Sequence, residues 1–114
     1  PVYISGSKYT PPDKDNVREA MPVLFDLLIN EKNAVVRAVL GHFFFVYIHP
    51  YMDGNGRIAR FLMNLMLASG GYSWIIIKVD DRTTYMEALE EASVKNDITK
   101  FAKFISGLIK ENEK

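Results

Sequence analysis

Twelve residues near the middle of the chain combine the groups that chemistry on a bound phosphate requires. The segment runs from His49 to Arg60 and reads His-Pro-Tyr-Met-Asp-Gly-Asn-Gly-Arg-Ile-Ala-Arg. The imidazole of His49 titrates near pH ~6.5 and can accept a proton at neutral pH. Asp53 offers a carboxylate for magnesium, and Arg57 and Arg60 offer guanidinium groups that can fork onto phosphate oxygens. Each group has a separate role if the ligand is a nucleoside triphosphate carried on a magnesium ion.

Two helices are expected to position this segment. Residues 34–48 are apolar almost all round, which predicts a helix buried on most of its faces. Pro50 disfavours the helical conformation for the residue before it, so this helix should end next to His49. Residues 57–69 predict a second helix, closed by a pair of glycines. The chemistry therefore lies in a helix-loop-helix unit over residues 34–69.

The loop between these helices has the character of an anion site. Gly54 and Gly56 can adopt backbone angles that let successive N–H groups point at one anion. The loop leads into a helix N-terminus, which favours phosphate, and Arg57 and Arg60 share a face of the first turn. Taken singly, these residues are more typical of a turn and a solvated helix face. Their order within one segment favours the functional interpretation.

The segment resembles the signature of the Fic domain family, His-Pro-Phe-x-Asp/Glu-Gly-Asn-Gly-Arg-x-x-Arg. It departs from that pattern at Tyr51, where phenylalanine is commoner. We expect Tyr51 to anchor the loop on the core, so this change should matter little. So many specified identities in twelve residues make a far more specific signal than a lone glycine motif.

The resemblance implies a protein adenylyltransferase, which moves AMP from magnesium-bound ATP to a serine, threonine or tyrosine hydroxyl of a target protein. His49 would be the general base, and Asp53 would bind Mg²⁺. Asn55 would hold the α-phosphate above an anion hole formed by the N–H groups of residues 54–57, and two arginines would grip the β- and γ-phosphates. The implied nucleotide site consists of Gly54, Asn55, Gly56, Arg57 and Arg60.

Several other functions stay open. Related Doc-type kinases carry a lysine where Gly56 stands, so the glycine favours nucleotidyl transfer over phosphorylation. The motif residues would bind the phosphates and the metal ion. The motif therefore does not distinguish AMP transfer from AMP removal, or from transfer of another nucleotide or of phosphocholine. A catalytically idle interaction module would have no physical need for the intact set of motif residues. A nucleic-acid-binding helical domain is disfavoured because 14 basic residues balance 14 acidic ones.

Length and composition predict one domain over residues 1–114, built as an all-α bundle of five or six helices around the buried helix 34–48. The absence of cysteine excludes a disulfide framework and a thiol nucleophile. No apolar run is long enough to cross a bilayer and no signal peptide is visible, so we expect no membrane partner and a cytoplasmic location, where ATP is available.

A small β-hairpin is expected over residues 1–10. Two short runs that favour strands flank Ser5-Gly6-Ser7. In Fic proteins a hairpin at this place, the flap, covers the active site and pairs with the backbone of the target protein. Either run could be the edge that accepts the target strand. The candidate target-binding residues are Val2, Tyr3, Ile4, Lys8, Tyr9 and Thr10.

The remaining chain predicts three more helices. Residues 17–30 have helical spacing, with a break or kink expected near Ala20-Met21 because of Pro22. Residues 82–94 and the run that follows Asp97 predict two others. His42 is expected to be a hydrogen-bonded core histidine in preference to a second active-site imidazole. Asn64 lies four residues after the last motif arginine and would either support it or be exposed.

Many Fic proteins are inhibited by a helix with the pattern Ser/Thr-x-x-x-Glu-Gly/Asn, whose glutamate pairs with the arginine equivalent to Arg60. Ser106 and Glu111 are one residue too far apart for that pattern, and Thr83 with Glu87 is followed by alanine. We therefore expect an inhibitory helix to come from an upstream segment or from a separate antitoxin chain.

Overall fold

The computed structural model describes Ile4 and residues 6–112, and the regular structure within these residues is entirely helical. The elements are α1 (Lys14–Asn30), α2 (Ala34–Ile48), α3 (Asn55–Ser69), the short 3₁₀ helix η1 (Val79–Asp81), α4 (Arg82–Lys95) and α5 (Thr99–Asn112). The predicted all-α fold is confirmed. None of these helices combines the length and apolar character that a membrane span requires.

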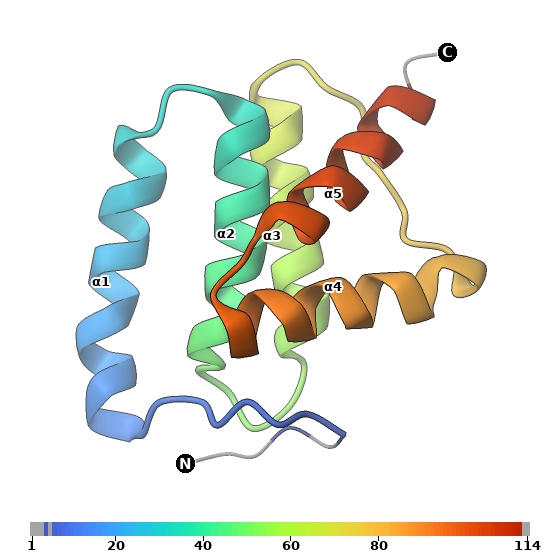
Figure 1. Cartoon of the computed structure of the whole chain (residues 1–114). Coiled ribbons are helices and arrows are strands. Elements are labelled where there is room, and N and C mark those ends of the chain that lie inside the picture. The colour runs from blue at the N-terminus through green and yellow to red at the C-terminus, as the bar shows by residue number, and fades with distance from the viewer. Residues whose placement is uncertain (1–3, 5, 113–114) are drawn as a thin grey trace.

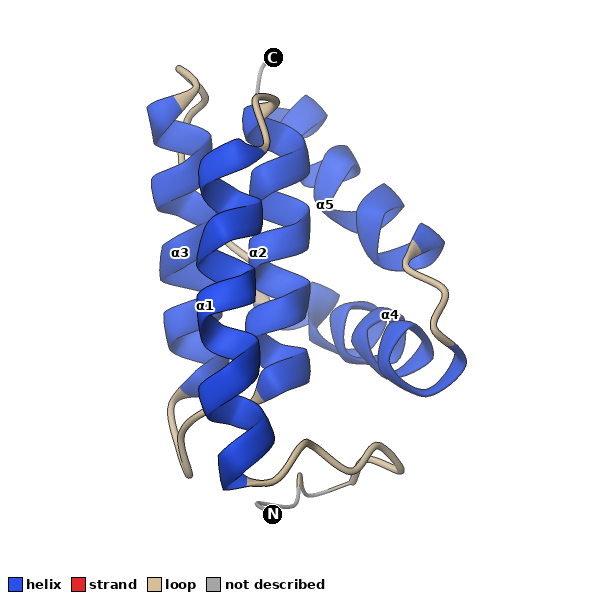
Figure 2. Ribbon diagram, turned by 90° about the vertical axis from the view of Figure 1, so that its left-hand side faces the viewer, coloured by secondary structure: helices blue, strands red, loops and turns tan. Residues whose placement is uncertain are grey.

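The helices form two groups around α2. Helices α1, α2 and α3 run alongside one another, and α4 and α5 cross the bundle on another side (Figures 1 and 2). Helix α2 contacts α1, α3, α4 and α5. The expected role of residues 34–48 as the buried central helix is therefore confirmed, and the loop that follows α2 takes its position from the most constrained element of the fold.

Local chemistry explains the bounds of α2. The side chain of Asn33 accepts hydrogen bonds from the N–H groups of Val35 and Val36, which satisfies two of the free donors at the helix start. The helix ends where the N–H of His49 donates to the carbonyl of Phe45 at 2.9 Å. Apolar residues on nearly every face then bury α2 between its neighbours.

Two apolar clusters hold the bundle together. The larger cluster joins α2 and α3 to α4 and α5, and Met63, Phe101 and Ile105 at its centre are fully buried. The smaller cluster joins α1 to α2 and α3. The motif loop connects α2 and α3, which contribute to both clusters, so it is anchored at each end in packed core.

Helix α1 has no break at Pro22, so that part of the prediction is wrong, whereas a kink there stays a prediction. Helix α1 begins at Lys14 and continues without interruption through Pro22 to Asn30. Pro22 lies exposed on the outer face of α1, where water can satisfy the carbonyl that loses its helical hydrogen bond.

The expected β-hairpin is not seen in the described residues. A turn is present, because the N–H of Ser7 donates to the carbonyl of Ile4 at 3.1 Å and Gly6 has a φ of 80°. Residues 8–10 follow without forming a strand. Of the other predicted run, Val2 and Tyr3 lie outside the described residues.

Candidate active site

His49 occupies the C-terminal end of α2 in a left-handed backbone conformation, with φ 52° and ψ 59°. A non-glycine residue in this region costs about 1–3 kcal/mol and persists only where the surroundings enforce it. Pro50 excludes the right-handed helical conformation from the preceding residue, and α2 fixes the residues before it. The result is a half-buried imidazole at the mouth of the motif loop, as the sequence predicted.

The surroundings of the imidazole determine which nitrogen can act as a base. Burial lowers the pKa of His49, and the backbone carbonyl of Val46 opposes this with a smaller raising effect. The buried Nδ1 atom forms no well-aligned hydrogen bond. Since Nδ1 is buried, Nε2 is the ring nitrogen open to an incoming hydroxyl, and a neutral ring with its proton on Nδ1 offers the Nε2 lone pair. His49 is therefore neutral and able to accept a proton at pH 7.

Asn55 shapes the loop through two hydrogen bonds to Tyr51. Its Oδ1 accepts from the Tyr51 N–H at 3.1 Å, and its Nδ2 donates to the Tyr51 carbonyl at 2.6 Å. Asn55 is only 3% exposed. The sequence did not indicate this structural role of Asn55. The expected contact between Asn55 and the α-phosphate stays a prediction. Tyr51 is 55% exposed, but its ring centroid lies 6.4 Å from that of the buried Phe45, so the ring contacts the core as expected and the Tyr51 backbone adds a second anchor.

The start of α3 presents free backbone donors. Gly54 precedes the helix with a φ of 81°, an angle that favours glycine, and no side chain caps the helix. The N–H of Gly54 is engaged by Oδ1 of Asp53 at 2.8 Å. Within the described residues, the N–H groups of Asn55, Gly56 and Arg57 have no such partner. Three N–H groups and the positive end of the helix dipole are thus available to an anion.

Both motif arginines fold back over the glycines. The Nη2 atom of Arg57 lies 3.2 Å from the position that a Cβ of Gly54 would occupy, and the Nη1 atom of Arg60 lies 3.1 Å from the corresponding position at Gly56. The two guanidinium groups therefore lie at the same end of α3 as the free N–H groups. Any side chain at Gly54 or Gly56 would press on them.

A polar hollow of about 210 Å³ extends from Arg60. Its lining includes the side chains of Lys78, Arg82 and Tyr85, and it contains no carboxylate. Three cations around one small hollow favour an anionic occupant. Arg82 and Tyr85 lie outside the twelve-residue motif, and the sequence gave no sign of Lys78.

His42 and Asn64 are structural. His42 is fully buried and hydrogen-bonded to Tyr85, which confirms the core assignment. Both expectations for Asn64 are wrong, since it is 6% exposed and its amide exchanges two hydrogen bonds with the backbone of Ile75. The α3 face that carries Asn64 is covered by the extended segment before η1, a contact between distant residues that the sequence did not reveal.

The exposed position of Asp53 suits a magnesium ion that is also bound by the phosphates of a nucleotide. Its side chain is exposed at the rim of the loop, and one of its oxygens is held by Gly54. The described residues contain no cluster of three or more His, Asp or Glu side chains, so no protein-only metal cage is present among them. Mg²⁺ is commonly bound by one or two carboxylates together with substrate phosphates and water. The donor set fits that mode of binding.

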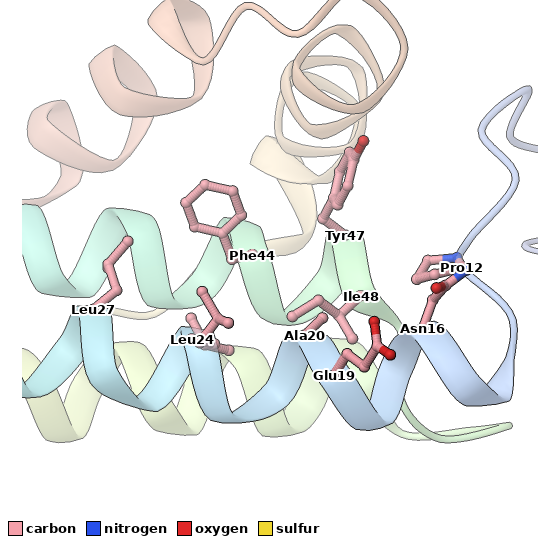
Figure 3. A pocket seen from close by; sticks show the side chains of 10 residues that line it. Pro12, Asn16, Glu19, Ala20, Leu24, Leu27, Phe44, Tyr47 and Ile48 are labelled. Carbon is pink, nitrogen blue, oxygen red and sulfur yellow. The ribbon is translucent and has the colours of Figure 1, made fainter.

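A larger hollow of about 480 Å³ lies between α1 and α2 and has a different character. Figure 3 shows side chains of both helices facing it, among them Leu24, Leu27 and Phe44. Its lining is mostly apolar and includes no cation. This hollow therefore offers no lysine or arginine to a polyphosphate, in contrast to the start of α3.

Comparison with known proteins identifies relatives of the chain. Residues 2–67 match the model of the Fic/DOC family. The protein adenylyltransferase Fic of Nematostella vectensis is 36% identical over 104 residues, which cover 88% of this chain and 24% of that protein. The protein adenylyltransferase fic-1 of Caenorhabditis elegans is 31% identical over 109 residues, covering 92% of this chain and 21% of that protein. The chain thus spans about a quarter or less of these relatives.

Solved structures share the fold. A Fic domain containing signaling protein from Bacteroides thetaiotaomicron superposes with a TM-score of 0.84 at 27% identity, covering 98% of this chain and 48% of that one. Fic-1 from Caenorhabditis elegans superposes with a TM-score of 0.80 at 28% identity, covering 95% of this chain and 34% of that one.

Proposed function

Because the chain belongs to the Fic/DOC family, we propose that it transfers AMP from magnesium-bound ATP to a hydroxyl group of a target protein. The observation that carries this proposal is the convergence of three kinds of group at one loop. His49 offers a free Nε2, the start of α3 offers three unpaired N–H groups, and two guanidinium groups fold over the same glycines. The relatives named protein adenylyltransferase support the same reaction class.

In the proposed reaction, the target hydroxyl oxygen attacks the α-phosphorus. A bond forms between that oxygen and phosphorus, the bond from phosphorus to the bridging oxygen of the β-phosphate breaks, and pyrophosphate leaves. The Nε2 atom of His49 takes the hydroxyl proton. The N–H groups of Asn55, Gly56 and Arg57 stabilise charge on the α-phosphate, and the guanidinium groups of Arg57 and Arg60 hold the leaving pyrophosphate.

Magnesium fits this scheme through Asp53. When held there by Asp53, the ion would neutralise part of the phosphate charge. The residues of the chain supply the remainder: α2 holds the base, Asn55 fixes the loop by its bonds to Tyr51, and the helix start offers donors that need no rearrangement. The Asn55 amide would contact the α-phosphate through its remaining N–H.

The experiment that tests this proposal uses the purified chain, α-labelled ATP, magnesium and a cell lysate. We expect labelled protein with the wild type and a loss of about 10²–10⁴ in rate with His49→Ala, the usual cost of removing a general base. Calorimetry should show that His49→Ala still binds ATP, and that Asp53→Asn no longer gains ATP affinity when magnesium is added. Labelling by His49→Ala at the wild-type rate would reject the assignment of the base.

A further inference from the structure

A single carboxylate on α4 holds the N-terminal segment. The Oε1 atom of Glu90 accepts a hydrogen bond from the hydroxyl of Ser7 at 2.5 Å, and its Oε2 atom accepts one from the backbone N–H of Lys8 at 2.9 Å. The hydroxyl oxygen of Ser7 in turn accepts from the N–H of Tyr9 at 3.0 Å. Glu90 thereby sets the course of the backbone from Ser7 to Tyr9 across α4.

A second anchor lies close to the catalytic base. The hydroxyl of Tyr9 donates to the backbone carbonyl of Tyr47 at 2.7 Å, and the two rings pack with their centroids 4.6 Å apart. Tyr47 precedes His49 by two residues at the end of α2. The segment is therefore held at one point by α4 and at another by the C-terminal end of α2, two residues before His49.

These contacts also determine what the segment can offer to another chain. The N–H groups of Ser7, Lys8 and Tyr9 are all engaged within the protein, by Ile4, Glu90 and Ser7 respectively. A β-strand partner needs free N–H groups along the edge that it joins. Along the edge from Lys8 to Thr10, the N–H groups of Lys8 and Tyr9 are thus already hydrogen-bonded within the protein. The N–H of Lys8 donates to a charged carboxylate, which makes a stronger hydrogen bond than a neutral acceptor does.

We infer that Glu90 is a positioning residue for the segment expected to act as the flap, fixing Ser7 and Lys8 so that a target polypeptide meets a preformed backbone near the end of α2. This inference rests on the proposed function. Glu90 acts through the backbone of the segment and takes no part in the bond changes at phosphorus. Between the segment and α4 lies a hollow of about 520 Å³, with Glu90 and Met86 in its lining.

The first test measures the contact without reference to activity. In ¹H–¹⁵N spectra of the chain, the Lys8 amide should shift with the ionisation of Glu90, whose pKa is held below the ordinary value of 4.5 by the Lys8 N–H and the Ser7 hydroxyl. Glu90→Ala should abolish the pH-dependent shift of the Lys8 amide. Glu90→Gln keeps one acceptor oxygen but cannot ionise, so the Lys8 amide should no longer shift with pH in that variant either. Glu87→Ala, an exposed site one turn earlier in α4, is the matched control and should resemble the wild type. An unchanged Lys8 amide in Glu90→Ala would overturn the inference.

The second test compares two acceptors at the same site. Transfer of AMP to protein needs the flap, whereas transfer to water, which releases AMP and pyrophosphate, does not. Removing both hydrogen bonds in Glu90→Ala should lower labelling of lysate proteins about tenfold while changing hydrolysis of magnesium-ATP less than twofold. Glu90→Gln should fall between Glu90→Ala and the wild type, and Glu87→Ala should match the wild type.

The two ways to fail are distinct. Equal labelling by Glu90→Ala and an active wild type would reject the positioning role. A wild type that neither labels protein nor hydrolyses ATP would reject the proposed function, and the Lys8 titration would still report whether Glu90 fixes the segment.

Discussion

The Nε2 atom of His42 lies 2.6 Å from the hydroxyl oxygen of Tyr85, inside the bundle and beside Arg60. The other ring nitrogen, Nδ1, lies 3.3 Å from the sulfur of Met63. A thioether only accepts, so Nδ1 carries the proton, and Nε2 accepts the hydroxyl proton of Tyr85. The lone pairs of the Tyr85 oxygen are then free to face the Arg60 guanidinium. Burial raises the pKa of Tyr85, and the charge of Arg60 opposes this with a smaller lowering effect. A buried histidine thereby orients a tyrosine that faces the second arginine of the motif.

Replacing Tyr85 by phenylalanine should damage both stability and the nucleotide site. The substitution leaves Nε2 of His42 buried without a partner, which should lower the free energy of unfolding by about 1–3 kcal/mol. It also removes the acceptor beside Arg60, so the affinity for magnesium-ATP should fall several-fold. Urea unfolding and calorimetry measure the two effects, and Thr84→Ala, at an exposed neighbouring position, is the control. An unchanged affinity for magnesium-ATP in Tyr85→Phe would show that the His42–Tyr85 pair does not support Arg60.

His42 should make folding sensitive to mild acid. Burial, with a smaller contribution from Arg60, lowers its pKa from 6.5 to about 3. Below pH 6.5 the unfolded chain binds a proton at His42 that the folded chain does not bind, so stability falls as the pH falls from 6.5 towards 3. The slope approaches about 1.4 kcal/mol per pH unit, and above pH 6.5 the group has no effect. Urea unfolding at pH 7 and pH 5.5 should show a smaller drop in His42→Gln than in the wild type, and equal drops would contradict the assignment.

Gly56→Ala should weaken nucleotide binding without destabilising the fold. The new Cβ would lie 3.1 Å from Nη1 of Arg60, and the long arginine side chain can move away at little cost. Alanine is also the better helix former by about 1 kcal/mol. We expect unchanged or slightly higher stability with several-fold weaker binding of magnesium-ATP. Gly107→Ala, where a Cβ meets nothing within 4 Å, should gain stability and bind ATP normally. Wild-type ATP affinity in Gly56→Ala would show that the position of Arg60 is unimportant.

Asn64→Leu should destabilise the chain although leucine is similar in size. The Nδ2 of Asn64 donates to the carbonyl of Ile75 at 3.1 Å, and the N–H of Ile75 donates to Oδ1 at 2.9 Å. Leucine would leave both backbone groups buried and unpaired, a cost of about 2 kcal/mol or more. Asn112→Ala removes an exposed amide that donates to Trp74 in the same extended segment, and it should cost less. Thermal and urea unfolding of the two variants provide the measurement, and equal losses would show that the burial of the Asn64 pair is not the cause.

The sequence by itself determined the elements and the chemistry of the motif. The apolar run 34–48 could only be a buried helix, and the structure has that helix from Ala34 to Ile48. Pro50 required the helix to stop at His49, and the glycines required a loop before α3. These features follow from neighbours in the chain, whose steric and hydrogen-bonding effects are local, so a pattern of residue types is enough to predict them.

Only the tertiary structure decided which distant groups meet. Asn64 pairs with Ile75, Tyr85 links His42 to Arg60, and Glu90 reaches Ser7 and Lys8 from 83 and 82 residues away. Pro22 kept its helix because its face is exposed, a property that depends on where α1 lies in the bundle and not on proline itself. Each of these outcomes depends on burial and on the direction of a side chain after packing. A sequence pattern predicts the amphipathic face of a helix, but the partner of a polar side chain on that face is set by the element that comes to cover it.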